Sequence, residues 1–196
     1  MLRRQAKTIA PSVLRKLLAK VRRGTNPKRD QVIILLSVRA GLRACEIAGL
    51  TWDMVLDPYA RVSSVLNIHS RIAKRGSGRR VPIHPQLRKV LVELKRCSPT
   101  RYTETDEPVI RSARGGHMRA NSIVNWFVEI FRSLGLQGCS SHSGRRTFIT
   151  KAARAAHRAG ASLRDVQVLA GHRSIETTQS YIDGDTEAQR RLVKLI

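Results

Sequence analysis

Residues 166–181 read VQVLAGHRSIETTQSY, and this stretch says most about how the chain folds. It predicts the end of one helix, a break at Gly171, and a second helix that starts after Ser174. The Ser174 hydroxyl can cap the second helix by accepting from the free N–H groups of its first turn. We therefore expect His172 in the loop between two helices and Tyr181 near the end of the second one.

Helical spacing of apolar residues continues over most of the chain. The sequence predicts helices at residues 11–23, 28–40, 43–50, 85–96, 119–134, 143–159, 162–170, 175–182 and 185–195. Between residues 62 and 83 the period changes to that of short strands around a turn at 74–78, which predicts a β-hairpin or a three-stranded sheet. Another short strand is expected at 108–111. The predicted fold is mainly α with one small antiparallel β-sheet (α+β).

The length of 196 residues fits a single domain. We expect one domain over 1–196, with a first helix and N-terminal arm at 1–24, a β-hairpin region at 62–84 and a C-terminal tail at 183–196. No apolar run approaches the ~20 residues of a membrane span, and no signal peptide follows the basic N-terminus. The three cysteines lie far apart and form no CxxC pair, so we expect reduced thiols in a cytoplasmic protein.

The charge of the chain is strongly one-sided. Lys and Arg number 37 against 14 Asp and Glu, which gives a formal net charge of +23. Such a surplus strains a compact fold by self-repulsion and is relieved beside a polyanion. Most of the cations are Arg, whose planar fork grips phosphate in two places. Codon bias is the plain alternative, but the composition favours a nucleic-acid partner.

The last third of the chain holds a cluster of groups that could do chemistry. His142 and Arg145 are three residues apart at the start of a predicted helix, which puts both side chains on one face. A helix N-terminus also directs free N–H groups at an anion. Singly, each residue has an ordinary explanation, since a lone His at a helix start is usually a cap or a solvated side chain. Together with His172 and Tyr181 they suggest a site for phosphate chemistry.

These residues, together with others earlier in the chain, resemble the sequence motifs of a known protein family. Residues 41–50, GLRACEIAGL, resemble the first box of the tyrosine recombinases, the phage integrase family. Further matching elements follow in the order and spacing of that family: Lys74 eight residues before Pro82, His142-Ser143-Gly144-Arg145, Gly171-His172, and Tyr181 nine residues past His172. The resemblance covers roughly residues 11–181 and implies the tyrosine recombinase catalytic-domain fold.

The resemblance also implies a reaction: site-specific cutting and rejoining of double-stranded DNA, with no metal, cofactor or ATP. Tyr181 would attack the scissile phosphate, form a 3′-phosphotyrosine bond and release a 5′-hydroxyl, which can later reverse the step. Arg43, Arg145 and His172 would stabilise the charge of the transition state.

The other site residues also follow from the resemblance. It implies that Lys74 protonates the departing 5′-oxygen, that His142 acts near the Tyr181 proton, and that Glu46 supports the site without transferring a proton. Nearby arginines are expected to contact DNA: Arg71, Arg75, Arg79, Arg146 and Arg173.

The match begins close to the N-terminus, so we expect a short form without the N-terminal DNA-clamp domain that most family members carry, either natural or excised. Free in solution it would be a monomer, and on two DNA sites a tetramer in which the tail docks into a neighbouring subunit. A tail that folds back on its own subunit is the alternative, and no membrane partner is expected. Three alternatives remain open at this point. They are a non-catalytic DNA-binding regulator derived from a recombinase, a basic RNA-binding protein and a type IB topoisomerase-like enzyme.

Overall fold

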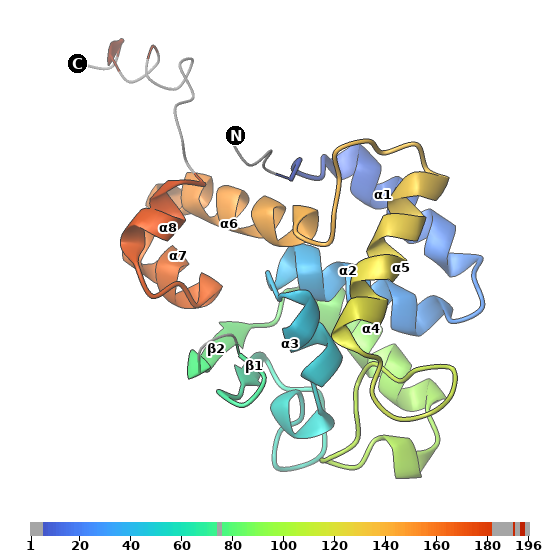
Figure 1. Ribbon diagram of the computed structural model, residues 1–196. Helices are drawn as coiled ribbons and strands as arrows, with labels where there is room; N and C mark the ends of the chain where they lie inside the picture. The colour runs from blue at the N-terminus through green and yellow to red at the C-terminus, as the bar shows by residue number, and fades with distance from the viewer. Residues whose placement is uncertain (1–5, 74–75, 182–189, 191–192, 195–196) are drawn as a thin grey trace. The chain divides into compact units, whose positions relative to one another are not determined.

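The computed structural model describes residues 6–73, 76–181, 190 and 193–194 (Figure 1). Its elements are α1 (Pro11–Arg22), α2 (Pro27–Arg39), α3 (Ala44–Gly49), β1 (Val65–Ile68), β2 (Arg79–Pro82), α4 (Pro85–Cys97), α5 (Ala120–Ser133), α6 (Ser143–Ala155), α7 (Leu163–Ala170) and α8 (Ile175–Gln179), with short 3₁₀ turns η1 (Trp52–Met54), η3 (Thr100–Tyr102) and η4 (His157–Ala159). The chain forms two compact units, residues 1–148 and 149–196, and the boundary between them falls inside α6.

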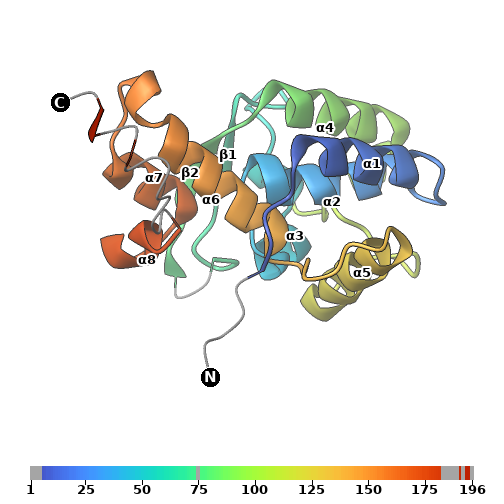
Figure 2. The same cartoon turned by 90° about the horizontal axis from the view of Figure 1, so that it is seen from above.

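Helix α2 lies at the centre of the first unit. It contacts α1, α3 and α4, and Figure 2 shows α1, α2 and α4 side by side. Every residue from Asp30 to Val38 is buried, and a helix that is apolar nearly all round needs neighbours on every side. The density of apolar residues in this segment therefore places it in the core.

Helix α1 shows why the flanking helices form. Pro11 occupies the first helical turn, where a missing N–H costs nothing. Leu14, Leu17, Leu18 and Val21 are buried at helical spacing, while the charged residues between them face water. The apolar stripe of the helix therefore fixes which side packs on α2.

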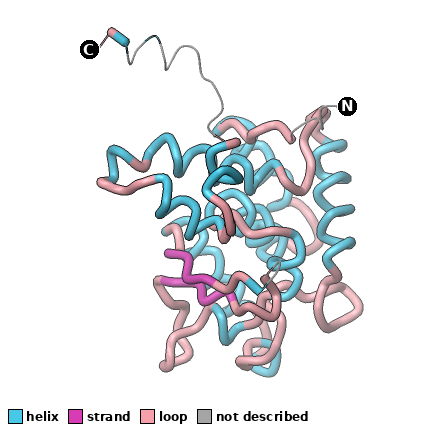
Figure 3. The backbone as a smooth tube through the Cα atoms, turned by 60° about the vertical axis from the view of Figure 1, so that its left-hand side comes forward, coloured by secondary structure: helices cyan, strands magenta, loops and turns pink. Residues whose placement is uncertain are grey.

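The sheet is small. Strands β1 and β2, the magenta segments of Figure 3, pair antiparallel. Val65 lies opposite Pro82, and Ile68 lies opposite Arg79. Side chains alternate along β2, so that Arg79 and Val81 are buried while Arg80 and Pro82 are exposed. The sheet has two strands in the described part of the chain, which confirms the hairpin form of the prediction.

The second unit contains the remainder of α6, then η4, α7 and α8. Helix α7 begins with a capping box, in which Ser162 N donates to Asp165 Oδ2 at 2.8 Å and the Asp165 N–H faces the Ser162 hydroxyl. Helices α7 and α8 pack on each other.

The structure corrects three expectations and leaves two others untested. The strand expected at 108–111 is absent: Pro108 and Arg111 each make one isolated bridge, to Thr51 and His117. The helix expected over 143–159 ends at Ala155, and the one over 175–182 ends at Gln179. Almost all of the tail helix expected at 185–195 lies outside the described residues. The expectation of one domain over 1–196 stays a prediction.

Candidate active site

Arg43 and Glu46 lie where α3 begins. Arg43 precedes the helix with extended backbone, and its own N–H donates to Glu46 Oε2 at 2.9 Å. The Arg43 Nη1 atom donates to Glu46 Oε1 at 3.0 Å. Glu46 is completely buried, while the Arg43 side chain keeps some exposure. One carboxylate therefore fixes both the backbone and the guanidinium of Arg43.

Glu46 has a second arginine partner, Arg79 on β2. Its two terminal nitrogens donate to the two carboxylate oxygens at 2.8 and 3.0 Å. Burial by itself would raise the pKa of Glu46, but hydrogen bonds and charge from Arg79, with those of Arg43, outweigh burial and lower the pKa. Glu46 is therefore held as a carboxylate.

Arg145 reaches the turn before Arg43. Its Nη1 donates to the carbonyl oxygen of Gly41 at 2.6 Å, and the residue is only 3% exposed. Gly41 has φ +66°, and a Cβ added there would lie 2.4 Å from Phe148 Cδ1. Residue 41 must therefore be glycine on two grounds, backbone conformation and space. In this way the start of α6 and the Arg43 turn are tied together.

A tight turn fixes the segment that carries His142. Ser140 N donates to Ser143 Oγ at 3.0 Å, Ser143 N donates to Ser140 O at 2.9 Å, and His142 N donates to Ser140 Oγ at 3.3 Å. Gly144, the residue after Ser143, packs against Ser37. A Cβ added at Gly144 would lie 2.2 Å from Ser37 Oγ. The turn leaves the His142 side chain exposed while Arg145 points inward.

His172 and Tyr181 come together in the second unit. Their rings stack with centroids 5.6 Å apart and an angle of 27° between the planes. The His172 Nδ1 atom is 2.9 Å from the hydroxyl of Thr178, which is completely buried. The Thr150 hydroxyl donates to the Tyr181 carbonyl at 3.3 Å. The predicted histidine and tyrosine are therefore neighbours with a fixed geometry.

Gln167 supports the loop that carries His172. Its buried side chain donates to the carbonyl oxygens of His172 and Arg173 at 3.0 and 3.1 Å. Gln167 and Thr178 were missed in the sequence, where each looks like an ordinary polar helix residue. Only the folded loop shows that their side chains are turned toward its backbone and ring.

The remaining candidates fall into different surroundings. Lys74 and Arg75 lie outside the described residues. Arg71 is well exposed and donates to Thr51 Oγ1 and Asp53 Oδ2, each at 3.2 Å. Arg146 is half-buried and Arg173 is exposed.

Arg79 was expected to contact DNA with the other four arginines. The structure places it differently, with a side chain 3% exposed and engaged by Glu46. A buried, paired guanidinium is badly placed to reach a phosphate, so the expected contact does not fit its position. The alternation of inward and outward residues along β2 was the available signal in the sequence, since it puts Arg79 on the same face as Val81.

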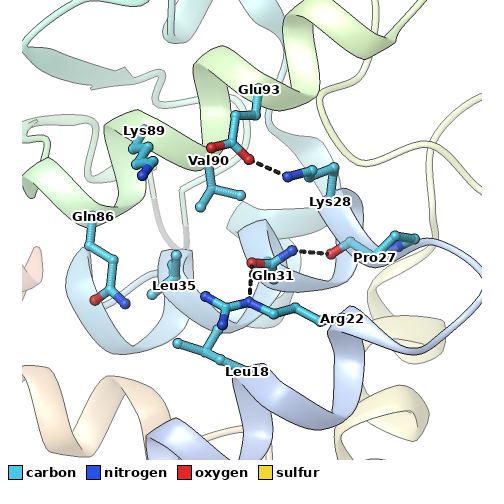
Figure 4. A pocket seen from close by; sticks show the side chains of 10 residues that line it. All are labelled: Leu18, Arg22, Pro27, Lys28, Gln31, Leu35, Gln86, Lys89, Val90 and Glu93. Atoms are coloured by element: carbon cyan, nitrogen blue, oxygen red, sulfur yellow. Dashed lines mark hydrogen bonds and ion pairs between the residues drawn. The ribbon is translucent and has the colours of Figure 1, made fainter.

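A separate cavity of about 550 Å³ lies between α1, α2 and α4 (Figure 4). Lys28 pairs there with Glu93, and Arg22 Nε donates to Gln31 Oε1 at 3.3 Å. Gln31 in turn donates to the Pro27 carbonyl at 2.9 Å. Among the described residues, none of the predicted catalytic ones lines this cavity, so it is separate from the candidate site.

Among the described residues, no three His, Cys, Asp or Glu side chains gather as ligands for a metal ion. The helices formed by these residues are too short or too polar to cross a bilayer.

The chain shares its fold with solved structures. It is similar to the Tn1549 transposon integrase in complex with a circular intermediate DNA, with TM-score 0.75 and 16% identity over 100% of this chain and 67% of that one. It is also similar to XerA recombinase, with TM-score 0.72 and 21% identity over 97% of this chain and 65% of that one. The predicted fold, that of a tyrosine recombinase catalytic domain, is confirmed.

Comparison with known sequences identifies the protein family of the chain. Residues 7–188 match the model of the phage integrase family, and the chain belongs to this family. It is 30% identical over 160 residues to tyrosine recombinase XerC of Brucella suis biovar 1 (strain 1330), covering 81% of this chain and 47% of that protein. It is 28% identical over 156 residues to XerC of Rickettsia prowazekii (strain Madrid E), covering 78% and 46%. The chain spans about half the length of the curated relatives it matches.

Proposed function

We propose that this chain cuts and rejoins double-stranded DNA at specific sites through a 3′-phosphotyrosine intermediate, without metal or ATP. Membership of the phage integrase family supports the class of reaction. The observation that carries the proposal is the stacked pair of His172 and Tyr181, with the histidine ring fixed by Thr178. A packing tyrosine needs no neighbour of this kind.

Tyr181 is the nucleophile in this proposal. Its hydroxyl oxygen attacks the scissile phosphorus, the bond from phosphorus to the 5′-oxygen breaks, and the phosphorus stays bound to the 3′-oxygen. The phosphotyrosine bond retains the energy of the broken bond, so a 5′-hydroxyl can reverse the step. Free tyrosine has a pKa of about 10, so its proton must be removed as the attack proceeds.

Arg43 and Arg145 neutralise the charge that develops on the non-bridging oxygens. Arg43 is held by Glu46, and Arg145 by the Gly41 carbonyl, so both guanidiniums are oriented before DNA arrives. Preorganised cations of this kind can each contribute about 10³-fold in rate. His172 adds a third donor to the same oxygens.

Lys74 and His142 complete the proton transfers. Lys74, which lies between β1 and β2 in the sequence, gives its proton to the departing 5′-oxygen. His142 acts as base or hydrogen-bond partner for the Tyr181 hydroxyl. The exposure of His142 supports a role toward a ligand.

Double-stranded DNA is the proposed partner, with Arg71, Arg75, Arg146 and Arg173 as backbone contacts. The Tn1549 integrase and the lambda integrase were solved bound to DNA, the latter at TM-score 0.66 and 16% identity over 90% of this chain and 48% of that one, which supports this choice. Arg71 pairs with Asp53 at the surface, and exposed pairs are weak enough to be exchanged for phosphate. We propose a cytoplasmic protein that is monomeric alone and tetrameric on two DNA sites.

The test uses candidate recombination sites that carry a nick beside the cut position. Cleavage then releases a short fragment, religation fails, and the covalent complex accumulates. We expect a denaturant-stable adduct that forms equally well in EDTA, and none with Tyr181→Phe. DNA binding without an adduct from the intact protein would favour a regulator. Relaxation of supercoils at many unrelated sequences would favour a type IB topoisomerase.

A further inference from the structure

Arg79 is the most deeply buried pairing partner of Glu46. It enters from β2, while Glu46 and Arg43 belong to the start of α3. Both of its terminal nitrogens are used, one on each carboxylate oxygen, at 2.8 and 3.0 Å. This bidentate form fixes the orientation of a carboxylate as well as its position.

Glu46 in turn orients Arg43. Its Oε1 also accepts from Arg43 Nη1 at 3.0 Å, and its Oε2 accepts from the Arg43 backbone N–H at 2.9 Å. The three side chains form a chain of ion pairs from the buried strand to the partly exposed Arg43. Arg79 thus holds the Glu46 carboxylate from β2, and the oriented carboxylate in turn holds Arg43 at the start of α3.

We propose that Arg79 is a positioning residue that holds Glu46, and through it aims the Arg43 guanidinium at the scissile phosphate. The inference rests on the proposed function, since it takes Arg43 as a phosphate-binding residue. It replaces the DNA contact expected for Arg79. It also distinguishes Arg79 from the adjacent Arg80, which points to the exposed side of the same strand.

The first experiment compares Arg79→Gln with Arg80→Gln. Each removes one cation from β2, but only the first breaks the ion pairs. DNA affinity is measured over a salt series, and adduct formation is measured at saturating nicked DNA. For Arg79→Gln we expect a salt slope equal to that of the intact protein and adduct formation slower by about 100-fold, the cost of a small misplacement of a reacting group.

The opposite pattern would overturn the proposal. Loss of a phosphate contact lowers the salt slope by about one and weakens binding, without slowing adduct formation at saturation. Arg80→Gln gives the baseline for removing one arginine from this strand. If the intact protein forms no adduct at all, the proposed function fails, and that result differs from any result of the Arg79 series.

A second variant covers the case in which Arg79→Gln does not fold. The double change Glu46→Leu with Arg79→Met removes the whole buried pair, and apolar replacement of such pairs is often neutral for stability. We expect a folded protein that binds DNA and forms adduct slowly, because Arg43 is no longer aimed. Full adduct formation by this variant would overturn the proposal. Arg79→Lys keeps the charge without the fork, and we expect it to restore only part of the rate.

Discussion

Arg145 donates a hydrogen bond of 2.6 Å to the carbonyl oxygen of Gly41, two residues before Arg43. This bond links two segments that lie more than one hundred residues apart in the sequence. It places the two arginines proposed to bind one phosphate on a shared backbone support. The geometry of this support depends on Gly41, whose conformation and surroundings exclude a side chain.

Gly41→Ala should therefore destabilise the protein more than the same substitution at another glycine with positive φ. Gly135 also has positive φ, +64°, but no described atom lies within 4 Å of an added Cβ, so Gly135→Ala should cost about 1 kcal/mol from backbone strain alone. Gly41→Ala adds a clash with Phe148 and should cost about 3 kcal/mol or more. Denaturant melts give both values. Equal losses at the two positions would show that the space around Gly41 is unimportant.

Thr178→Val should slow adduct formation without affecting the fold. Valine has nearly the same shape but cannot bond His172 Nδ1, which lies 2.9 Å from the threonine hydroxyl. A lost hydrogen bond of about 1 kcal/mol predicts a rate lower by about fivefold at saturating DNA. The matched control is Thr177→Val, because Thr177 is exposed on the same helix. A rate equal to that of the control would remove Thr178 from the site.

Glu46 should make stability depend on pH in a definite direction. Its folded pKa is lowered below the ordinary value of 4.5, chiefly because the hydrogen bonds and charge of Arg79 outweigh its burial. The stability that this carboxylate contributes is complete above pH 4.5 and is lost as the pH falls through the folded pKa. Glu46→Gln should thus cost about 3 kcal/mol at pH 7 and progressively less in acid.

Unfolding free energies measured from pH 7 to pH 3 test this prediction. Glu129→Gln, at an exposed position on α5, controls for the loss of one negative charge. The curve for Glu46→Gln should converge on that of the intact protein as the pH falls. Parallel curves would mean that Glu46 keeps the same proton affinity when the chain unfolds.

DNA binding should weaken steeply with salt. If each subunit neutralises about eight phosphates, the slope of log affinity against log salt should be about −7. Equilibrium binding from low to moderate salt measures it. A slope shallower than about −3 would show that most of the +23 charge faces water.

Much of the fold follows from local signals in the sequence. Helix α2 is recognisable from its density of apolar residues, and α7 from Ser162 and Asp165 at capping spacing. The strand predicted at residues 108–111 was wrong. The apolar pair Val109 and Ile110 is typical of a short strand, but it lies in a loop, where Val109 N donates to the Leu50 carbonyl.

Some site residues likewise have a clear signal in the sequence, and others do not. His142, Arg145, His172 and Tyr181 stand out by their order and spacing. Arg79 did not, because the segment before Pro82 is rich in arginine. Alternation along β2 could place Arg79 on the same face as Val81, but its pairing with Glu46, 33 residues away, has no local signal in the sequence.

Tyr181 is the residue proposed to become covalently attached to DNA, and the chain holds only two other tyrosines, Tyr59 and Tyr102. Tyr59 is 77% exposed, and the Tyr102 hydroxyl accepts from Arg101, which together with the charge of Arg101 and Arg111 lowers the pKa of Tyr102. The lowered pKa favours the ionised form of Tyr102, whereas the stacking of His172 on its ring selects Tyr181 as the nucleophile. The deciding measurement is mass spectrometry of peptides from the adduct trapped on nicked DNA. We predict the 3′-phosphate on the peptide that contains Tyr181, and its presence on Tyr102 or Tyr59 would contradict the proposed mechanism.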